Sequence, residues 1–203
     1  MEIFDSRVKL RPLRLSDAEI ILEWRSSDRA KYLHQGATSM RGQLDWMSLR
    51  PDDELNLIVE CSCGQIAGMV ALVGIDFCSS RAEAGRFFVD KRYSSRGFAV
   101  ATMNLLYQLA FLELELVCVT ANISASNKGI ISWHQHFGME VVGQGLARED
   151  IRGNGREVVR LELAKRKWET ITAPKMIQFL HVAYKRFGAT SCLCGSIEEF
   201  CHQ

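Results

Sequence analysis

The sequence predicts a mixed α/β fold in one main domain, because apolar runs of strand length alternate with segments of helical periodicity. Along the chain these segments give the order β-α-α-β-β-β-α-β-α-β-β, with no internal repeat. The 203 residues are 47% hydrophobic and 24% charged, so the chain has enough apolar material for a sizeable core.

Charge, hydropathy and cysteine use argue against several classes of protein. The formal net charge is +1 and the basic residues are dispersed, so neither nucleic acid nor an anionic membrane is an expected partner. No apolar run approaches the roughly 20 residues of a membrane-spanning helix. The first residues lack the basic start and apolar stretch of a signal peptide. Seven cysteines, an odd number with some inside apolar runs, are typical of reduced thiols in the cytoplasm.

The N-terminal part predicts a strand followed by two helices. Residues 7–11 alternate polar and apolar, as a half-buried strand does. Ser16 and Glu19 have the spacing of a capping box, which predicts a helix that runs through Trp24. A second helix is expected to begin near residues 38–39.

The middle of the chain predicts a hairpin, another strand and a long helix. Residues 55–61 and 65–75 are apolar runs around a short turn, and 81–89 form the next strand candidate. Gly85 within that strand predicts a β-bulge or a close backbone approach. Residues 97–114 have the periodicity of a helix with one apolar stripe, formed by Ala99, Met103, Leu106 and Ala110.

The last elements of the predicted sheet are a short buried strand at 116–121 and an antiparallel pair at 139–143 and 157–164. Between them we expect a short helix at 127–136, with Gly138 at its end.

The character of the chain changes after residue 165. A charged stretch and a proline precede an amphipathic segment at 175–187 and a cysteine-rich tail. We therefore predict a main domain over residues 1–165 and an appended helix and tail over 166–203.

The junction before the long helix has the features of an anion site. A strand ends at Val89, a polar loop runs from Asp90 to Arg96, and small residues open the helix. Such a junction directs several backbone N–H groups and the positive end of the helix dipole at one point, which suits a pyrophosphate. Gly97 and Ala99 leave room for phosphate oxygens, and Arg96 can add charge-assisted hydrogen bonds. An ordinary strand-to-helix turn with a basic residue is the alternative interpretation.

This junction resembles the coenzyme A signature of the GCN5-related N-acetyltransferase (GNAT) family, Gln/Arg-x-x-Gly-x-Gly/Ala. The final Gly-x-Ala matches and a serine replaces the leading Gln/Arg, in the run Ser94-Ser95-Arg96-Gly97-Phe98-Ala99. Further along, the family carries Asn-x-x-Ala-x-x-x-Tyr-x-x-x-Gly-Phe. Asn127 and Gly138 fall in register with it, while Ile130, His134 and Met139 replace the Ala, Tyr and Phe.

The resemblance covers residues 7–165. Within the family, the stretches 10–13 and 73–83 look most like the acetyltransferases of ribosomal proteins, polyamines and nucleotide-linked amino sugars.

The resemblance implies a twisted mixed sheet with helices on both faces, in which the strands at 81–89 and 116–121 splay apart. The pantetheine arm of acetyl-CoA would lie in that gap, bonded to the backbone of the first strand, and a backbone N–H there would stabilise the oxyanion. Asn127 would hold a pantetheine amide, and a helix N-cap is its alternative role. The expected cofactor-binding residues are Phe87, Phe88, Val89, Ser94, Ser95, Arg96, Gly97, Phe98, Ala99 and Asn127.

The resemblance also implies direct attack of a primary amine on the thioester, without an acyl-enzyme. His134 stands where the family carries the Tyr that protonates the leaving thiolate, so a histidinium is expected there. A solvent-exposed helix histidine is the alternative. Glu83, beside the gap, is the expected base, acting directly or through water, and pairing with Arg81 or Arg86 is its alternative role. The weaker candidates for the base are Asp76 and His34.

In the fold that the resemblance implies, the first two helices form the acceptor side, and the expected substrate-binding residues there are Trp24, Arg25, His34 and Trp46. This arrangement looks like that of acetyltransferases acting on nucleotide-linked 4-amino sugars. A flat aromatic ring and a cation suit a uridine and its diphosphate, although both tryptophans are equally typical of a core. A polyamine, held by the acidic residues 52–54, and a protein N-terminus are the other acceptors considered. A homodimer is compatible with the sequence.

Two functions from other classes stay open. The chain could bind coenzyme A without turnover, because Ser94 and His134 depart from the signature. Its cysteine-rich tail could alternatively make it an interaction or regulatory module. No metal is expected, since the spacing is poor for a zinc site built from Cys61, Cys63, Cys192, Cys194, Cys201 and His202.

Overall fold

The computed structural model describes residues 3–27, 30, 32, 36–146 and 157–187. The eight strands in this part of the chain form one sheet in the order β1-β2-β3-β4-β5-β6-β8-β7. All neighbouring strands are antiparallel except β5 and β6, which are parallel. The strands are β1 (Ile3–Phe4), β2 (Val8–Pro12), β3 (Leu55–Cys61), β4 (Ile66–Asp76), β5 (Arg81–Val89), β6 (Cys118–Ser124), β7 (Glu140–Leu146) and β8 (Glu157–Ala164).

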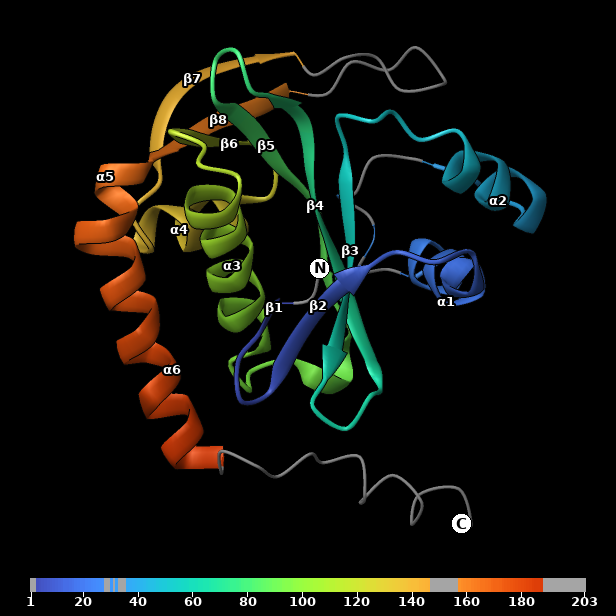
Figure 1. Cartoon of the computed structure of the whole chain (residues 1–203), viewed down its shortest axis with the longest axis horizontal. Coiled ribbons are helices and arrows are strands. Elements are labelled where there is room, and N and C mark those ends of the chain that lie inside the picture. Colours follow the sequence, from blue (N-terminus) through green and yellow to red (C-terminus); the bar gives the residue numbers. More distant parts are fainter. Residues whose placement is uncertain (1–2, 28–29, 31, 33–35, 147–156, 188–203) are drawn as a thin grey trace.

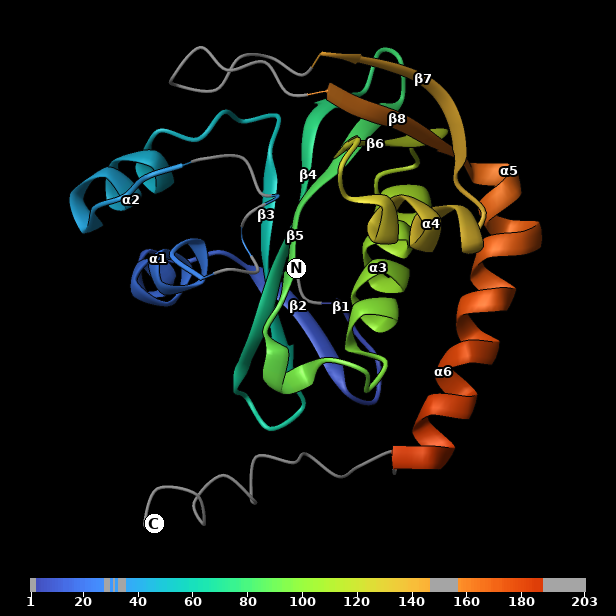
Figure 2. The same ribbon diagram turned by 180° about the vertical axis from the view of Figure 1, so that it is seen from behind.

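Helices cover both faces of the sheet, as predicted. Helices α1 and α2 lie on one face and α3 and α4 on the other, and α6 packs outside α3 (Figures 1 and 2). The α-helices are α1 (Ala18–Arg25), α2 (Met40–Ser48), α3 (Phe98–Gln108), α4 (Lys128–His136), α5 (Lys165–Lys167) and α6 (Ala173–Phe187). Short 3-10 helices are η1 (Leu15–Asp17) and η3 (Lys91–Tyr93), and π-helical turns are η4 (Leu109–Glu113) and η5 (Trp168–Thr172).

The sheet is buried on both faces because its central strands place apolar side chains on each side. In β3, Leu57 and Val59 belong to the apolar layer under α3, while Ile58 between them belongs to the layer under α1. This alternation follows from the two-residue period of a strand. The two layers explain why these strands are near-continuous apolar runs in the sequence.

The positions of the predicted elements are largely confirmed, with two local exceptions. The strand β1 was not predicted. The capping box expected at Ser16 is wrong, because Ser16 lies inside η1 and the carboxylate of Asp17 instead accepts the backbone N–H of Arg14 at 2.8 Å. The second helix begins as expected, and its N-cap Ser39 accepts the N–H of Gly42 at 3.2 Å.

Helix α3 does not have the single apolar stripe that its sequence predicts. All of its residues from Val100 to Tyr107 are buried. The helix is surrounded because the sheet covers one side and α6 the other, where Met176 and Leu180 join the same apolar core. The segment after residue 165 therefore contributes to the packing of the main domain.

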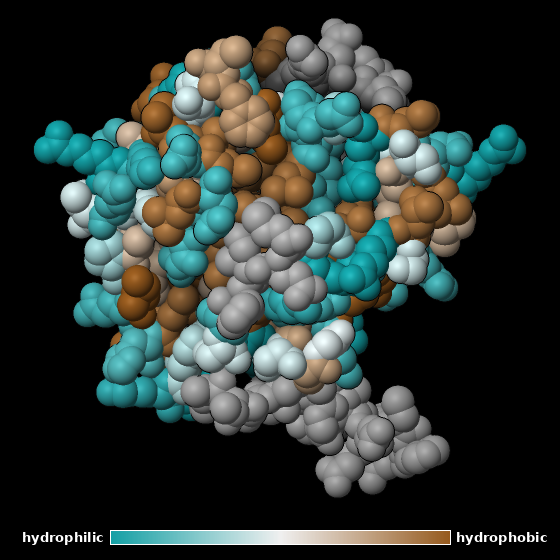
Figure 3. Space-filling view, viewed as in Figure 1, coloured by the Kyte–Doolittle hydropathy of each residue, from teal (hydrophilic) through white to brown (hydrophobic). Residues whose placement is uncertain are grey.

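The outer side of α6 and the turn before it remains partly apolar. Ile171, Ile177 and Val182 are 48%, 57% and 61% exposed. On this flank, hydrophobic side chains interrupt the hydrophilic surface in Figure 3.

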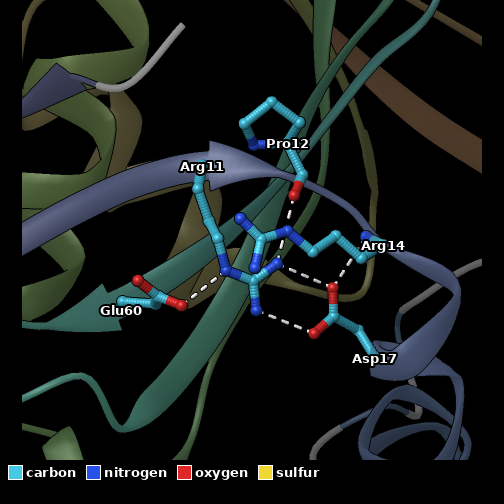
Figure 4. A network of polar contacts seen from close by, with 5 residues as sticks. All are labelled: Arg11, Pro12, Arg14, Asp17 and Glu60. Carbon is cyan, nitrogen blue, oxygen red and sulfur yellow. Dashed lines mark hydrogen bonds and ion pairs between the residues drawn. The ribbon is translucent and has the colours of Figure 1, made fainter.

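A buried ion pair holds α1 against the sheet. The guanidinium of Arg11 in β2 donates two hydrogen bonds, of 2.7 and 2.8 Å, to the carboxylate of Asp17, and a third to Glu60 in β3 (Figure 4). Burial of Asp17 opposes its ionisation, but the hydrogen bonds from Arg11 and from the N–H of Arg14 outweigh burial and lower its pKa. The pair therefore joins two strands to the start of α1.

We predict that Asp17→Asn lowers the free energy of unfolding by about 3 kcal/mol, because it removes one of the two carboxylates that pair with the buried Arg11 cation. Urea unfolding measures this change. Glu19→Gln, an equally conservative change at an exposed position of α1, is the control and should alter stability by less than about 0.5 kcal/mol. Equal effects of the two substitutions would contradict the structural role of the ion pair.

Candidate functional site

The strands β5 and β6 pair over a short distance and then separate. Their parallel register joins Arg81–Glu83 to Cys118–Thr120 only. Beyond this point β6 stays paired with β8 through Ser124, and β5 continues to Val89 without a strand on its β6 side. The edge of β5 therefore presents backbone N–H and C=O groups that a ligand can bind.

A β-bulge re-aims β5 at this opening. Met69 pairs with Phe88 and Ala71 with Gly85, so β5 has one residue more than β4 between these pairs. The bulge expected at Gly85 thus lies at the next two residues, and the left-handed backbone belongs to Arg86, with φ 50°. Such a conformation costs a non-glycine residue free energy and is found disproportionately at functional sites.

One cavity of about 1210 Å³ runs through the opening toward α1 and α2. Its walls bring together most of the predicted site residues: Trp24, Arg25, Trp46, Glu83, Phe87, Phe88, Val89, Ala99, Asn127 and His134. His34 falls outside the described residues. The loop residues Ser94, Ser95, Arg96, Gly97 and Phe98 do not line the cavity, and of this predicted set only Ala99, in the first turn of α3, reaches it.

The start of α3 offers uncompensated hydrogen-bond donors. The first bond of the helix runs from the N–H of Ala101 to the carbonyl of Gly97 at 2.9 Å, so the three preceding amides have no partner within the helix. No side chain caps this end. The Oγ of Ser94 is also buried without a hydrogen-bond partner, and Ser95 has a φ of 62°. These features fit an anion at the helix N-terminus.

Gly97 has a different reason for being glycine from the one expected. A Cβ on Gly97 would meet Ala183, Leu180 and Tyr184 of α6 at 3.4 to 3.7 Å. The side of Gly97 on which a Cβ would lie therefore faces α6. Its φ of 86° is the feature that requires glycine.

Asn127 and His134 lie on one face of α4, together with Ile130, and all three line the cavity. Asn127 occupies the N-cap position, but its side chain makes no capping hydrogen bond. The amide group is thus not engaged in the alternative role that the sequence suggested.

Glu83 faces the cavity and accepts a hydrogen bond from Nδ2 of Asn122 at 2.7 Å. Burial raises its pKa, and the bond from Asn122 only partly opposes this. The two arginines considered as its partners pair elsewhere: Arg81 with Glu162 and Arg86 with Glu54. A carboxylate with a raised pKa beside an opening in the sheet is suited to accept a proton.

His134 is 5% exposed, so it is not the solvent-exposed helix histidine of the alternative interpretation. Burial lowers its pKa to about 4, and its Nδ1 is buried without a partner. The histidinium expected at this position is therefore disfavoured at neutral pH. A neutral imidazole can still donate one hydrogen bond.

The far end of the cavity combines aromatic rings with two arginines. Trp24 stacks on Phe88 at 5.2 Å between ring centroids and is only 3% exposed, as a core residue would be. The guanidinium groups of Arg25 and Arg86 lie 5.5 and 5.3 Å from the ring centroid of the half-buried Trp46. Burial and the nearby Arg86 lower the pKa of Arg25.

Arg86 lines this end of the cavity, and it is not among the candidate site residues that the sequence predicted. Its side chain donates to Glu54 at 2.9 Å and to Asn56 at 3.1 Å, which fixes it beside Trp46. The sequence signal that could have indicated Arg86 was the bulge predicted at the neighbouring Gly85, because a bulge changes the direction in which a strand residue points.

The remaining carboxylate candidates have structural roles. Asp76 accepts hydrogen bonds from Ser79 and from the N–H of Cys78 in the β4–β5 turn, and the bonds from Ser79 are the main cause of its lowered pKa. It is thus a poor base. In the acidic stretch 52–54, Glu54 is used by Arg86.

Two features are absent from the described residues. No group of His, Cys, Asp and Glu side chains there could hold a metal ion. No helix among them is long and apolar enough to cross a membrane.

Comparison with known proteins identifies the family. The model of the acetyltransferase (GNAT) domain family matches residues 7–140 of the 203-residue chain. The chain therefore belongs to the GNAT acetyltransferase family, whose members use acetyl-CoA as the acetyl donor.

The relatives agree with this assignment. YdaF of Bacillus subtilis (strain 168), described as a candidate ribosomal N-acetyltransferase, is 30% identical over 108 residues, which cover 52% of this chain and 57% of YdaF. The match thus spans little more than half of that relative.

Solved structures share the fold. A GCN5-related N-acetyltransferase from Brucella melitensis has a TM-score of 0.76 at 20% identity and covers 89% of this chain and 85% of its own. A variant of the spermidine N-acetyltransferase SpeG from Vibrio cholerae has a TM-score of 0.68 at 18% identity, with 82% and 98% covered. The predicted GNAT fold is confirmed.

We predict that His134 makes stability depend on pH. The unfolded imidazole has a pKa near 6.5 and the folded one about 4, so the unfolded state binds the proton first as the pH falls. The stability due to the neutral imidazole is complete above pH 6.5 and is lost toward pH 4. The loss of unfolding free energy between pH 7 and 4.5 should be about 2 kcal/mol smaller in His134→Gln than in the natural protein. Urea unfolding at the two pH values measures it, and equal losses would contradict the burial of a neutral His134.

Proposed function

We propose that the chain is an acetyl-CoA-dependent N-acetyltransferase that transfers an acetyl group directly to a primary amine. The observation that supports this best is the cavity through the β5–β6 opening, which joins the start of α3 to the chamber beside α1 and α2. A donor and an acceptor can enter it from opposite ends and meet at Glu83 and His134. The buried Cys61 and Cys118 form no disulfide, which is consistent with a cytoplasmic location.

The residues of the donor end suit acetyl-CoA. Unpaired amides at the start of α3, with the buried hydroxyl of Ser94, would hold its pyrophosphate. The free edge of β5 from Phe87 to Val89 and the side chain of Asn127 would bind the pantetheine amides. When bound, acetyl-CoA supplies an activated acyl group as a thioester.

The residues at the centre divide the proton transfers. Glu83 accepts one proton from the acceptor ammonium, directly or through water, which frees the nitrogen lone pair for attack on the acyl carbon. The C–N bond forms, the C–S bond breaks, and the second amine proton passes to the sulfur. His134, held neutral by burial, donates a hydrogen bond to that sulfur. A backbone N–H at the β5 edge stabilises the developing oxyanion.

The acceptor end favours an anionic substrate with a flat ring. Two guanidinium groups border Trp46, and Glu83 is the one carboxylate among the described residues that line the cavity. A nucleotide-linked 4-amino sugar supplies a diphosphate for the arginines and a base for the indole. A polyamine would face two cations here. A protein N-terminus and coenzyme A binding without turnover are the competing functions.

We predict that Glu83→Gln lowers kcat/KM by about 10²- to 10⁴-fold, the usual contribution of a general base. The natural enzyme should also gain activity as the pH rises through the raised pKa of Glu83, and the variant should lose this dependence. Thiol release from acetyl-CoA measures both. Glu157→Gln, at an exposed position of β8 outside the cavity, is the control. Unchanged turnover in Glu83→Gln would remove Glu83 from the reaction.

We predict that a UDP-4-amino sugar is acetylated with a higher kcat/KM than spermidine or short peptides. A preference for spermidine or peptides would contradict the proposed nucleotide-sugar acceptor. If none of these amines is acetylated, the result would favour a protein that binds coenzyme A without turnover.

We also predict that Arg86→Ala raises the KM for the UDP-4-amino sugar about tenfold or more, because a charge-assisted contact contributes about 1.5 to 3 kcal/mol. The KM for acetyl-CoA should be unchanged.

A further inference from the structure

The helix α6 is tied to the N-terminal segment of the chain beside the start of α3. The hydroxyl of Tyr184 in α6 donates to Oδ2 of Asp5 at 2.5 Å. The other oxygen of Asp5 accepts the backbone N–H groups of Arg7 and Val8, each at 2.8 Å. One carboxylate thus fixes the chain that precedes β2 and the last turns of α6 to each other.

Arg7 lies between α6 and the loop that precedes α3. Its guanidinium stacks over the ring of Tyr184, 4.4 Å from the centroid, and Nη1 donates to the carbonyl oxygen of Arg96 at 3.2 Å. The side chain is 6% exposed, and Nε and Nη2 are buried without hydrogen-bond partners. A buried cation with open donors is costly unless a negative group shares its surroundings.

The same turn of α6 also sets the backbone of the loop. Gly97 follows the carbonyl bound by Arg7. A Cβ added to Gly97 would contact Leu180, Ala183 and Tyr184, so this side of the residue faces α6. Gly97 is the N-cap residue of α3, so the position of α6 fixes the direction in which the first amides of α3 point.

We propose that Arg7 and Tyr184 are positioning residues for the donor site: they hold the loop at Arg96 and Gly97 so that the amides of α3 converge on the pyrophosphate. The charge of Arg7 adds to the positive end of the helix dipole. α6, which lies beyond the residues 7–140 matched by the family model, thereby becomes part of the coenzyme A site. This inference rests on the proposed use of acetyl-CoA.

Calorimetric titration with coenzyme A tests the proposal in the full chain. Tyr184→Phe, which keeps the ring and removes the bond to Asp5, should weaken binding by about fivefold to tenfold. Arg7→Met should weaken it by about tenfold or more, while Arg7→Lys, which keeps the charge, should retain part of the affinity. The KM for the amine acceptor should not change in any of these variants.

Tyr107→Phe is the matched control for a structural effect. Tyr107 lies in α3 away from the loop, and its buried hydroxyl donates to the sulfur of Met139 at 3.6 Å. This variant should change the unfolding midpoint without changing coenzyme A affinity. Natural affinity in both Tyr184→Phe and Arg7→Met overturns the positioning role. No coenzyme A binding by the natural protein overturns the proposed function itself, which keeps the two failures distinct.

Discussion

The separation of β5 from β6 is the constraint on which the rest of the site depends. The two strands share three residue pairs, while β6 is committed to β8 along its whole length. The bulge at Arg86 lies just beyond the last of these pairs and bends β5 there. An ordinary parallel pair would have used the backbone groups of β5 in the sheet and closed the passage between its two faces. The open edge instead leaves donors and acceptors for an extended ligand, and one cavity is lined both by residues of α1 and α2 and by residues of α3 and α4.

The passage is positively charged at both ends and close to neutral at its centre. At the start of α3 the positive end of the dipole and the buried Arg7 favour an anion. The centre is close to neutral, because burial raises the pKa of Glu83 and lowers that of His134. At the far end Arg25 and Arg86 again favour an anion, beside the ring of Trp46. A reaction between an amine and a thioester needs such a centre, where an ammonium can lose its proton and a thiolate can be released.

Most of the fold could be predicted from the sequence because strand and helix periods, glycines and turn residues are local signals. The features that were wrong or missed depend on contacts between distant segments. Nothing near Ser16 shows that Asp17 will bind an arginine of β2, and α3 loses its single stripe only because α6 covers its outer side. For the site, the resemblance predicted the loop, Asn127 and Glu83; Asn127 and Glu83 line the cavity, whereas residues 94–98 of the loop do not. The environment of His134 and the direction of Arg86 follow from burial and from a bulge, which local periodicity does not encode.

Amide hydrogen exchange of the natural protein with and without coenzyme A tests the central claim most directly. Slower exchange is expected at two separate places: the loop and first turn of α3, from Ser95 to Val100, and the edge of β5 from Ala84 to Val89. The edge strand β7, which β6 and β8 separate from β5 in the sheet, should be unaffected. Protection confined to other segments, or none at saturating coenzyme A, would contradict the assignment of the β5–β6 opening as the donor site.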